Sequence, residues 1–351
     1  MHTWSSDSDA ELLFALQGGL PLCARPFAAM ATRLGMAEAD VVACAEELLR
    51  SGFARRLGGI FDSRRLGYSS TLCAADVPEC DLAPIVAQLA PHSGITHCYQ
   101  REGPPNLWFT VTAPAGRLDA KLAELAGVLR PWELASLPAR RTFKIEVVLD
   151  VRARDGGPAA RTLGGDWTGE APLKTDAAPA EHAAAAGDVG ARLTERERAV
   201  VRRLQASIPI MPEPFGAMAR DLGYTPEQLL DLLSEWRDAG VLRRIALILR
   251  HRALGFAANG MCVWSVGAER IEAAGRALAG CAEVSHCYER APHRLFPFDL
   301  FAMVHAGSRE AAQRMRARVA DAAGLAGGRM LLSVQEFKKS SPALFQEGGA
   351  E

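Results

Sequence analysis

Two short stretches of the chain carry the same set of chemically capable side chains. The first holds His97, Tyr99 and Arg101, and the second holds His286, Tyr288 and Arg290. On a β-strand, alternate residues face one side, so each set would share a face while Cys98 and Cys287 point to the other. Arg binds carboxylates through paired hydrogen bonds, His exchanges protons near neutral pH or ligates a metal, and Tyr supplies a hydrogen bond or a proton. The pattern predicts a site for an anionic ligand.

Further cationic and imidazole side chains gather around the second stretch. Arg250-His251-Arg252 precedes it, and Pro292-His293-Arg294 and then His305 follow it. In the first half, Asp62-Ser63-Arg64 stands where the second half has Arg250-His251-Arg252, so His251 has no counterpart. This divergence predicts either one asymmetric site or two specialised sites. From these residues alone, a polar sheet edge or salt bridges between the halves would explain the same pattern.

The chain is an internal duplication. Leu16-Gln17 matches Leu204-Gln205 at an offset of 188, and the His-Cys-Tyr triplets at 97 and 286 match at an offset of 189. Near the end of each half, Phe143-Lys144 matches Phe337-Lys338 at an offset of 194. Offsets that change only between periodic segments are produced by loop insertions. The sequence therefore predicts two copies of a unit of about 140 residues each.

Each copy has the same order of expected elements. Three short helical patterns and an apolar strand give the outline of a winged helix-turn-helix, and a βαββαβ pattern, typical of a ferredoxin-like module, follows. The fold class is α+β. We expect copy-one strands near 70–77, 94–101, 107–113 and 142–149, with Thr225 as the N-cap of the third helix of copy two. The expected domains are 9–56 and 193–244 (helix-turn-helix), 57–150 and 245–340 (ferredoxin-like), and a linker at 151–192, where Ala, Gly and Pro fill 22 of 42 positions.

One face of each ferredoxin-like sheet is expected to need a partner, because the two helices cover only the other face. The second copy is the obvious partner, so we predict that the halves pair as an intramolecular pseudo-dimer. The third helix of each helix-turn-helix is a poor DNA reader. Residues 37–51 and 225–239 each hold four acidic residues and one arginine, a net charge of −3, and a DNA groove favours Lys and Arg.

Composition excludes other classes of protein. Of the 351 residues, 49% are hydrophobic and 23% are charged, which is ordinary for a globular chain. The 40 basic and 41 acidic residues give a net charge of −1, so no chain-wide basic field points to nucleic acid. We expect no membrane span and no secretory signal. The eight cysteines form no C-x-x-C pair, which favours reduced thiols in a cytoplasmic protein.

The specific strings resemble a known family. A helix-turn-helix followed by a βαββαβ module is similar to the Lrp/AsnC regulators. Within that group, LRHRALGFAANGMCVW, VSHCYER and VQEFKK in copy two resemble one subunit of the sirohaem decarboxylases. RRLGGIFDSRRLGYSSTL and THCYQR in copy one resemble the partner subunit. A chain with both types resembles the fused form found among denitrifiers, in the pathway to haem d1, whereas the unfused pair also serves an alternative haem route.

The resemblance implies a non-oxidative decarboxylase. Such an enzyme removes CO₂ from the acetate side chains at C12 and C18 of sirohaem and gives 12,18-didecarboxysirohaem. Sirohaem carries eight carboxylates, which suits a pocket rich in Arg and His. The macrocycle can accept the electron pair left by CO₂, and a proton donor must then complete the new methyl group. We expect no cofactor beyond the iron of the substrate and no metal site of the protein's own.

The resemblance and the residue pattern together suggest roles. Arg250, Arg252, Arg290 and Arg294, with Arg64 and Arg101 from copy one, would anchor carboxylates. His251 and His286 would be proton donors, or one of them a ligand of the sirohaem iron, and His97 would serve the copy-one side. Tyr288 and Tyr99 would position the reacting acetate.

Two other functions fit parts of the sequence. The first is a tetrapyrrole-sensing regulator of the Lrp/AsnC type, which would need a DNA-competent helix. The second is an amino-acid-responsive regulator, which would not need the Arg-His-Arg and His-Cys-Tyr strings. The expected partner is sirohaem, with no DNA and no membrane. Association of the chain with further copies or with related decarboxylase subunits is left open.

Overall fold

The computed structural model describes residues 7–145, 189–250 and 255–346. Copy one comprises α1 (Asp7–Gly18), α2 (Pro26–Leu34), α3 (Glu38–Arg50), β1 (Ala54–Phe61), β2 (Tyr68–Ala75), α4 (Glu79–Leu89), β3 (Ile95–Arg101), β4 (Leu107–Pro114), α5 (Leu118–Val128) and β5 (Ala135–Ile145). A short α6 (Val189–Arg192) precedes copy two. Copy two comprises α7 (Glu195–Ala206), α8 (Pro214–Asp221), α9 (Pro226–Asp238), β6 (Leu242–Leu249), β7 (Ala258–Trp264), α10 (Ile271–Gly280), β8 (Val284–Arg290), β9 (Leu300–Ala306), α11 (Arg309–Ala322) and β10 (Arg329–Lys339).

Local sequence signals start the helices of the two helix-turn-helix units. Thr225 accepts a hydrogen bond from the backbone N–H of Gln228, and the Gln228 side chain accepts one from the Thr225 N–H. This reciprocal capping box satisfies two of the donors that a helix start leaves open, and Pro226 suits the first helical position. The N-cap predicted for Thr225 is confirmed. Thr194 and Glu197 form the same arrangement at α7.

The third helices pack with their apolar side inward and leave their acidic side exposed. Leu229, Leu233 and Trp236 of α9 are buried in the core. Asp231 and Glu235 of the same helix are exposed. In α3, Val41 and Leu48 are buried in the same way. The exposed surface of each third helix is therefore negative, as the sequence predicts.

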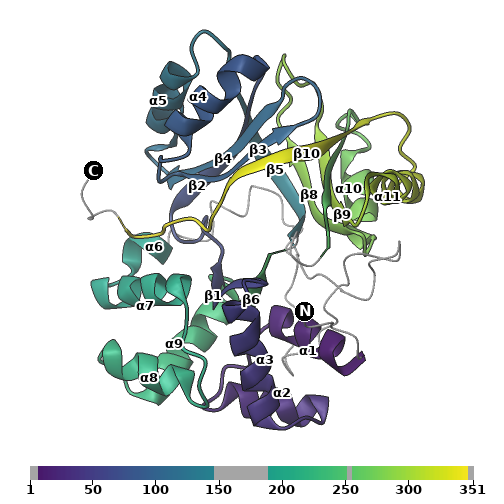
Figure 1. The fold of residues 1–351 in the computed structure, drawn as a ribbon. Coiled ribbons are helices and arrows are strands. Elements are labelled where there is room, and N and C mark those ends of the chain that lie inside the picture. The colour runs from purple at the N-terminus through teal and green to yellow at the C-terminus, as the bar shows by residue number, and fades with distance from the viewer. Residues whose placement is uncertain (1–6, 146–188, 251–254, 347–351) are drawn as a thin grey trace.

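The two ferredoxin-like sheets close into one eight-stranded barrel (Figure 1). Within each copy the strand order is that of a ferredoxin-like sheet, β3-β4-β2-β5 and β8-β9-β7-β10. The long last strand of each copy crosses to the other: β5 pairs with β2 and then with β8, while β10 pairs with β7 and then with β3. The barrel therefore has two seams between the copies and no free edge.

The helices lie outside this barrel and the two inner sheet faces cover each other (Figure 1). Helices α4 and α5 flank the copy-one strands, and α10 and α11 flank those of copy two. Trp108 from copy one packs inside against Phe296 from copy two, with ring centroids 4.9 Å apart. The predicted intramolecular pseudo-dimer is confirmed.

The wings of the two helix-turn-helix units also pair. β1 and β6 form an antiparallel two-stranded ribbon that runs from the Ala54–Leu249 pair to the Phe61–Leu242 pair. In Figure 1 this ribbon lies between the helical region and the barrel. The space between the ribbon and the barrel is thus bounded by both copies.

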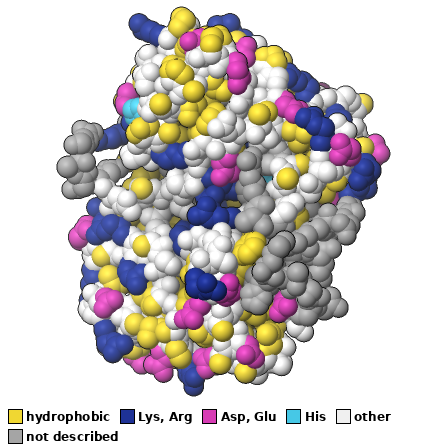
Figure 2. Space-filling model, viewed as in Figure 1, with side chains coloured by type: hydrophobic (Ala, Val, Ile, Leu, Met, Phe, Trp, Pro, Cys, Tyr) yellow, Lys and Arg dark blue, Asp and Glu magenta, His cyan; other side chains and the backbone are white. Residues whose placement is uncertain are grey.

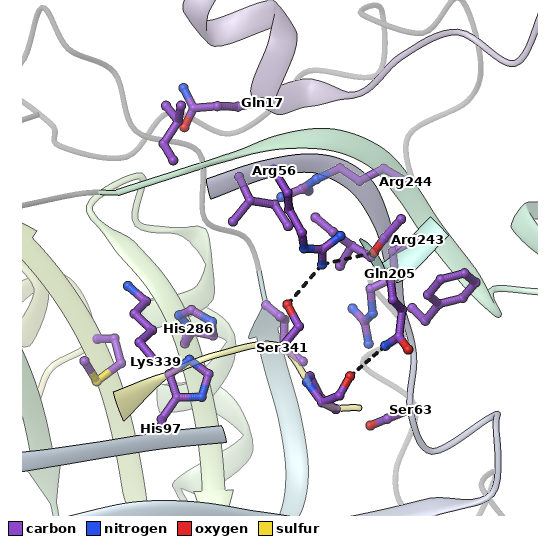
Figure 3. Close-up of a pocket in the computed structure, with 18 of the residues that line it drawn as sticks. Gln17, Arg56, Ser63, His97, Gln205, Arg243, Arg244, His286, Lys339 and Ser341 are labelled. Carbon is purple, nitrogen blue, oxygen red and sulfur yellow. Dashed lines mark hydrogen bonds between the residues drawn. The ribbon is translucent and has the colours of Figure 1, made fainter. Parts of the chain in front are cut away.

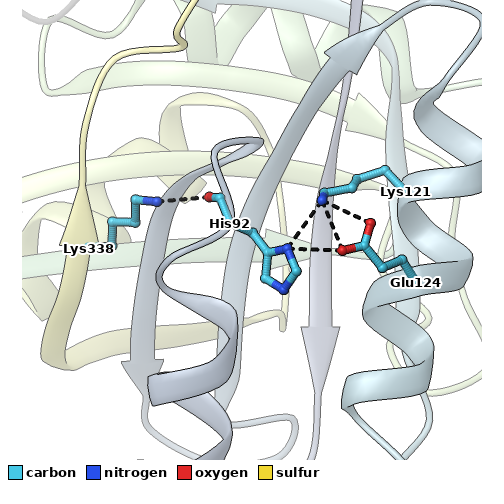
Figure 4. Close-up of polar contacts among 4 residues, drawn as sticks. All are labelled: His92, Lys121, Glu124 and Lys338. Carbon is cyan, nitrogen blue, oxygen red and sulfur yellow. Dashed lines mark hydrogen bonds and ion pairs between the residues drawn. The ribbon is translucent and has the colours of Figure 1, made fainter. Parts of the chain in front are cut away.

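Matching lysines fasten each copy to the other. Lys144 of β5 donates from Nζ to the carbonyl oxygen of Cys281, at the end of α10, over 3.0 Å. Lys338 of β10 donates to the carbonyl oxygens of Ala90 and His92, after α4, over 2.6 and 2.9 Å, and Figure 4 shows the contact with His92. Each cation meets the carbonyl-rich end of a helix, where positive charge is favoured.

The last strand of copy one was expected near 142–149, but β5 begins at Ala135 and ends at Ile145. Its first half pairs with β2 and is selected by that long-range contact, which the local pattern does not reveal. The expected linker 151–192 lies outside the described residues except for α6. No helix in the described ranges has the length and apolarity needed to cross a membrane.

Candidate functional site

A cavity of about 450 Å³ lies between the β1–β6 ribbon and the open end of the barrel. Figure 2 shows Lys and Arg side chains gathered in a hollow at this waist of the molecule. Ile60, Phe61, Leu247 and Ile248 contribute apolar surface from the ribbon. A flat apolar ligand with charged groups around its edge would fit against this wall.

Five of the residues to which the sequence analysis assigned a role in the site meet in this cavity: His97, Tyr99, Arg101, His286 and Tyr288. They come from β3 and β8, which occupy equivalent positions in the two copies. The rings of His97 and Tyr99 stack with centroids 6.3 Å apart, and those of His286 and Tyr288 with centroids 6.1 Å apart. The alternation predicted for these strands is confirmed, since Cys98 and Cys287 are buried on the opposite faces.

Both cavity histidines are held neutral. Burial, with Lys339 and Arg55 nearby, lowers the pKa of His97 to about 3. Burial and the neighbouring cations Lys339 and Arg243 lower the pKa of His286 to about 4. Burial likewise raises the pKa of the tyrosine hydroxyls of Tyr99 and Tyr288. At neutral pH the wall therefore offers neutral imidazoles and protonated phenols.

Two guanidinium groups lie farther along the same strands, one on buried Arg101 and one on half-buried Arg290. Arg101 donates to the Leu331 carbonyl oxygen over 3.0 Å, and Arg290 donates to the Leu137 carbonyl oxygen over 2.7 Å. Burial lowers the pKa of each to about 10, so both stay charged at neutral pH. Neither has a carboxylate partner among the described residues. An uncompensated buried cation is costly, and an anionic ligand would relieve that cost.

The structure does not place every predicted residue at the cavity. Arg290 lies behind Tyr288, with its guanidinium 4.8 Å from that ring, and is not among the lining residues. Arg294 is exposed and pairs with Glu133. Arg64 is half exposed and lies 3.6 Å from a carboxylate oxygen of Asp62. Arg250 is exposed, and His251 and Arg252 lie outside the described residues.

Several lining residues were not predicted as site residues. They are Gln17, Arg56, Ser63, Gln205, Arg243, Arg244, Asn259, His305, Lys339 and Ser341. The sequence held a signal for three of them, because Arg55-Arg56 and Arg243-Arg244 match in the repeat. Figure 3 shows Arg56, Arg243 and Arg244 on the ribbon side of the cavity, with His97, His286 and Lys339 on the barrel side.

Asp62 orients one of these arginines. Its carboxylate accepts a hydrogen bond from Arg243 over 2.7 Å, across the two copies. Burial alone would raise the pKa of this carboxyl, but Arg243 and Arg64 outweigh it and hold the pKa below its usual value. The pair keeps Arg243 at the cavity wall.

The C-terminal segment 340–346 closes one side of the cavity. Ser341 accepts a hydrogen bond from Arg56 over 3.0 Å, and the Pro342 carbonyl oxygen accepts one from Gln205 over 2.7 Å (Figure 3). Farther along, the Phe345 N–H donates to the Tyr68 hydroxyl over 2.7 Å. This segment therefore joins the barrel to the second helix-turn-helix.

The cavity differs between its two ends. Lys339 of β10 stands opposite His97 in the strand pairing, whereas the matching position of β5 opposite His286 is Ile145. His305 and Asn259 line the cavity only on the copy-two side. No group of three or more His, Cys, Asp or Glu side chains suited to a metal ion occurs among the described residues.

Comparison with known proteins defines the class first. The family description "AsnC-like ligand binding domain" matches residues 65–144 and 253–338, and "Siroheme decarboxylase NirDL-like HTH domain" matches residues 9–55 and 197–243. The fold and the cavity thus define a tandem protein of two helix-turn-helix units and two AsnC-like ligand-binding domains.

Similarity over the full chain then defines the family. A siroheme decarboxylase of Hydrogenobacter thermophilus is 32% identical over 96% of this chain and 95% of that protein. The siroheme decarboxylase NirDL subunit of Paracoccus denitrificans is 35% identical over 89% of this chain and 88% of that protein. The crystal structure of the siroheme decarboxylase NirDL in complex with an iron-uroporphyrin III analogue is similar at a TM-score of 0.68, with 28% identity over 97% of this chain and 95% of that chain. The chain belongs to the sirohaem decarboxylase family of carbon–carbon lyases.

Proposed function

We propose that this chain decarboxylates sirohaem at the cavity between the ribbon and the barrel. The reaction removes the acetate carboxyls at C12 and C18 and gives 12,18-didecarboxysirohaem. The observation that carries the proposal is the buried guanidinium group of Arg101 at the cavity, which, like that of half-buried Arg290, has no carboxylate partner among the described residues. A polycarboxylate ligand supplies the missing negative charge. The names of the full-length relatives point to the same substrate.

Binding is the first task of the side chains. Arg101 faces carboxylates inside the cavity, and Arg290, behind Tyr288, adds positive charge at the equivalent position of copy two. Arg56, Arg243 and Lys339 neutralise carboxylates at the cavity wall. The apolar side chains of the ribbon exclude water from the face of the macrocycle, which strengthens each charge interaction. Tyr99 and Tyr288 stand between the histidines and the arginines and hydrogen-bond the reacting acetate.

The chemical step needs a place for one electron pair and one proton. When the bond between the acetate methylene and its carboxyl breaks, CO₂ leaves and the electron pair stays on the methylene carbon, where the conjugated macrocycle stabilises it. A proton delivered to that carbon gives a methyl group. The cavity imidazoles are neutral without ligand, but substrate carboxylates raise the pKa of a neighbouring imidazole and let it take up a proton. We therefore assign the proton exchange to an imidazole of this cavity, His97 or His286.

Some assigned roles rest on the sequence alone. His251 as a proton donor, and Arg64, Arg250, Arg252 and Arg294 as carboxylate anchors, stay predictions. His251→Ala should lower turnover strongly with the fold intact, and unchanged turnover would remove His251 from the mechanism. We propose that the iron carried by sirohaem is the only metal involved. The product is proposed to feed haem d1 synthesis, because the fused architecture resembles that form.

The decisive experiment identifies the product. The purified chain is incubated with sirohaem without oxygen, and the product is isolated and examined by mass spectrometry and proton NMR. Two new methyl groups, at C12 and C18, support the proposal. New methyl groups at other positions would retain a decarboxylase but reject the assigned carboxyls. Unchanged sirohaem would reject the function.

A further inference from the structure

The two cavity histidines have different partners behind them. Ser285, directly before His286, is fully buried and its Oγ lies in contact with three groups. The distances from Oγ are 3.1 Å to Nδ1 of His286, 3.0 Å to Nε2 of His305 and 3.2 Å to the carbonyl oxygen of Met303. A serine hydroxyl has one proton to donate and two lone pairs that accept.

Counting protons fixes the state of His286. The Met303 carbonyl can only accept, so the single Ser285 proton goes to it if all three contacts are hydrogen bonds. Both imidazoles must then donate to Ser285: His305 from Nε2–H and His286 from Nδ1–H. Because His286 is neutral and already carries its proton on Nδ1, its Nε2 is left with a lone pair. In a neutral imidazole the bond made by one nitrogen sets the state of the other.

The same count gives the opposite state for His97. Thr96, the counterpart of Ser285, is also buried, and its hydroxyl lies 3.0 Å from Nδ1 of His97. No other acceptor for that hydroxyl is found among the described residues. A buried hydroxyl needs an acceptor for its proton, so Thr96 donates to Nδ1. The proton of neutral His97 is then on Nε2.

The difference arises from substitutions between the copies. Strand pairing places Met303 opposite His286 and Thr110 opposite His97, so two residues further along His305 corresponds to Thr112. Copy one therefore has a threonine where copy two has the imidazole that donates to Ser285. The two copies therefore have polar side chains at the same positions, but the proton of the cavity histidine lies on Nε2 in copy one and on Nδ1 in copy two.

We propose that His286 presents an unprotonated Nε2 to the cavity and His97 presents an Nε2–H, with Ser285 and His305 as the positioning residues that impose this difference. His97 is then a hydrogen-bond donor that orients a carboxylate. His286 is the group that takes up a proton from water and delivers it to the methylene carbon from which CO₂ has left. The roles rest on the proposed function, whereas the protonation states can be measured on the protein without ligand.

The direct test is NMR of the full chain labelled with ¹⁵N histidine. Two-bond ¹H–¹⁵N correlations show which ring nitrogen carries the proton, and the His97→Gln and His286→Gln spectra assign the signals. We expect the Nδ1–H form for His286 and the Nε2–H form for His97. In Ser285→Ala, and in His305→Thr, which restores the copy-one residue, the His286 signal should move towards the Nε2–H form. The same form for both histidines in the unaltered chain would overturn the proposal.

Kinetic measurements distinguish the proposed division of roles between His97 and His286 from a merely structural role of these residues. Gln can replace the N–H of His97 but cannot carry a proton for His286. His97→Gln should therefore act mainly on KM, whereas His286→Gln should lower kcat by about a hundredfold or more. His305→Thr should lower kcat by about ten- to hundredfold, as loss of a supporting hydrogen bond does at other sites, with KM nearly unchanged.

Thr112→Val in copy one is the matched control and should leave kcat and KM unchanged. Equal kcat losses in His97→Gln and His286→Gln would contradict the division of roles. Absence of decarboxylation by the unaltered chain would reject the proposed function. The NMR experiment would still test the protonation states, because it needs no ligand.

Discussion

Lys144 and Lys338 make the same contact in opposite directions across the pseudo-dimer. Each lies near the end of the last strand of its own copy and donates to backbone carbonyl oxygens at the end of a helix in the other copy. Phe143, beside Lys144, reinforces one of these contacts: a Cβ at Gly275 of α10 would lie 2.3 Å from its ring. Only glycine admits this approach.

These lysine contacts between the copies should contribute to the free energy of unfolding. Lys144→Met leaves the Cys281 carbonyl without its charged donor, and we expect a loss of about 1.5–3 kcal/mol in the free energy of unfolding. Urea titration followed by circular dichroism measures it. Lys121→Met is the control, because Lys121 pairs with Glu124 on the surface of α5 (Figure 4). Surface pairs of this kind contribute about 0.3–0.5 kcal/mol. Equal losses in both variants would contradict the role assigned to Lys144.

The two cavity histidines should make the protein sensitive to acid. His97 and His286 have pKa values of about 3 and about 4 in the folded chain, below the value of about 6.5 in an unfolded chain. Unfolding therefore takes up protons between these limits, and stability falls as the pH drops from about 6.5, by up to about 1.4 kcal/mol per pH unit for each histidine. The double variant His97→Gln/His286→Gln should lose less stability between neutral pH and pH 5. An equal loss in both proteins would show that these imidazoles are not held neutral in the folded chain.

Buried Arg101 should contribute more to ligand affinity than to the free energy of unfolding. Arg101→Met removes a desolvated cation, so the free energy of unfolding should change by less than about 2 kcal/mol. Affinity for an iron porphyrin with several carboxylates should fall about tenfold or more, because a charge-assisted hydrogen bond is lost. Absorbance titration of the iron porphyrin gives this affinity. Arg276→Ala is the control: it removes an exposed arginine that pairs with Glu272 and has no assigned role in the site, so the affinity should stay within about twofold. Undiminished binding by Arg101→Met would exclude Arg101 as an anchor.

The helix-turn-helix units should not hold DNA. Exposed Asp40 and Glu46 on α3, and Asp231 and Glu235 on α9, place negative charge where a reader of the major groove needs positive charge. In a gel-shift assay at low salt with random duplex DNA, we expect no complex. A complex that weakens as salt is added would instead favour the tetrapyrrole-sensing regulator.

The sequence was most informative where structure is local or repeated. The strand expected near 94–101 agrees with β3, Ile95–Arg101, because its alternation and the repeat both mark it. The shared face of His97 and Tyr99 follows from strand geometry alone. These features need no knowledge of which strand is the neighbour.

The rest depends on contacts between distant residues. Arg243 reaches the cavity because β6 pairs with β1 of the other copy, and nothing near Arg243 in the chain encodes that pairing. Arg294 has the composition of a site residue, but Glu133 is close enough to bind it. His305 was noticed as one more imidazole, and its link to His286 through Ser285 appears only when β8 and β9 are side by side.

The central claim is that one cavity built by both copies removes two carboxyls from sirohaem. The most direct measurement determines by mass spectrometry how many CO₂ each sirohaem molecule loses during anaerobic incubation. The unaltered chain and His286→Gln are tested in parallel at equal concentration. The account predicts loss of two CO₂ with the unaltered chain and strongly slowed loss with the variant. Sirohaem that binds, as its absorbance shows, but keeps its full mass with the unaltered chain would contradict it.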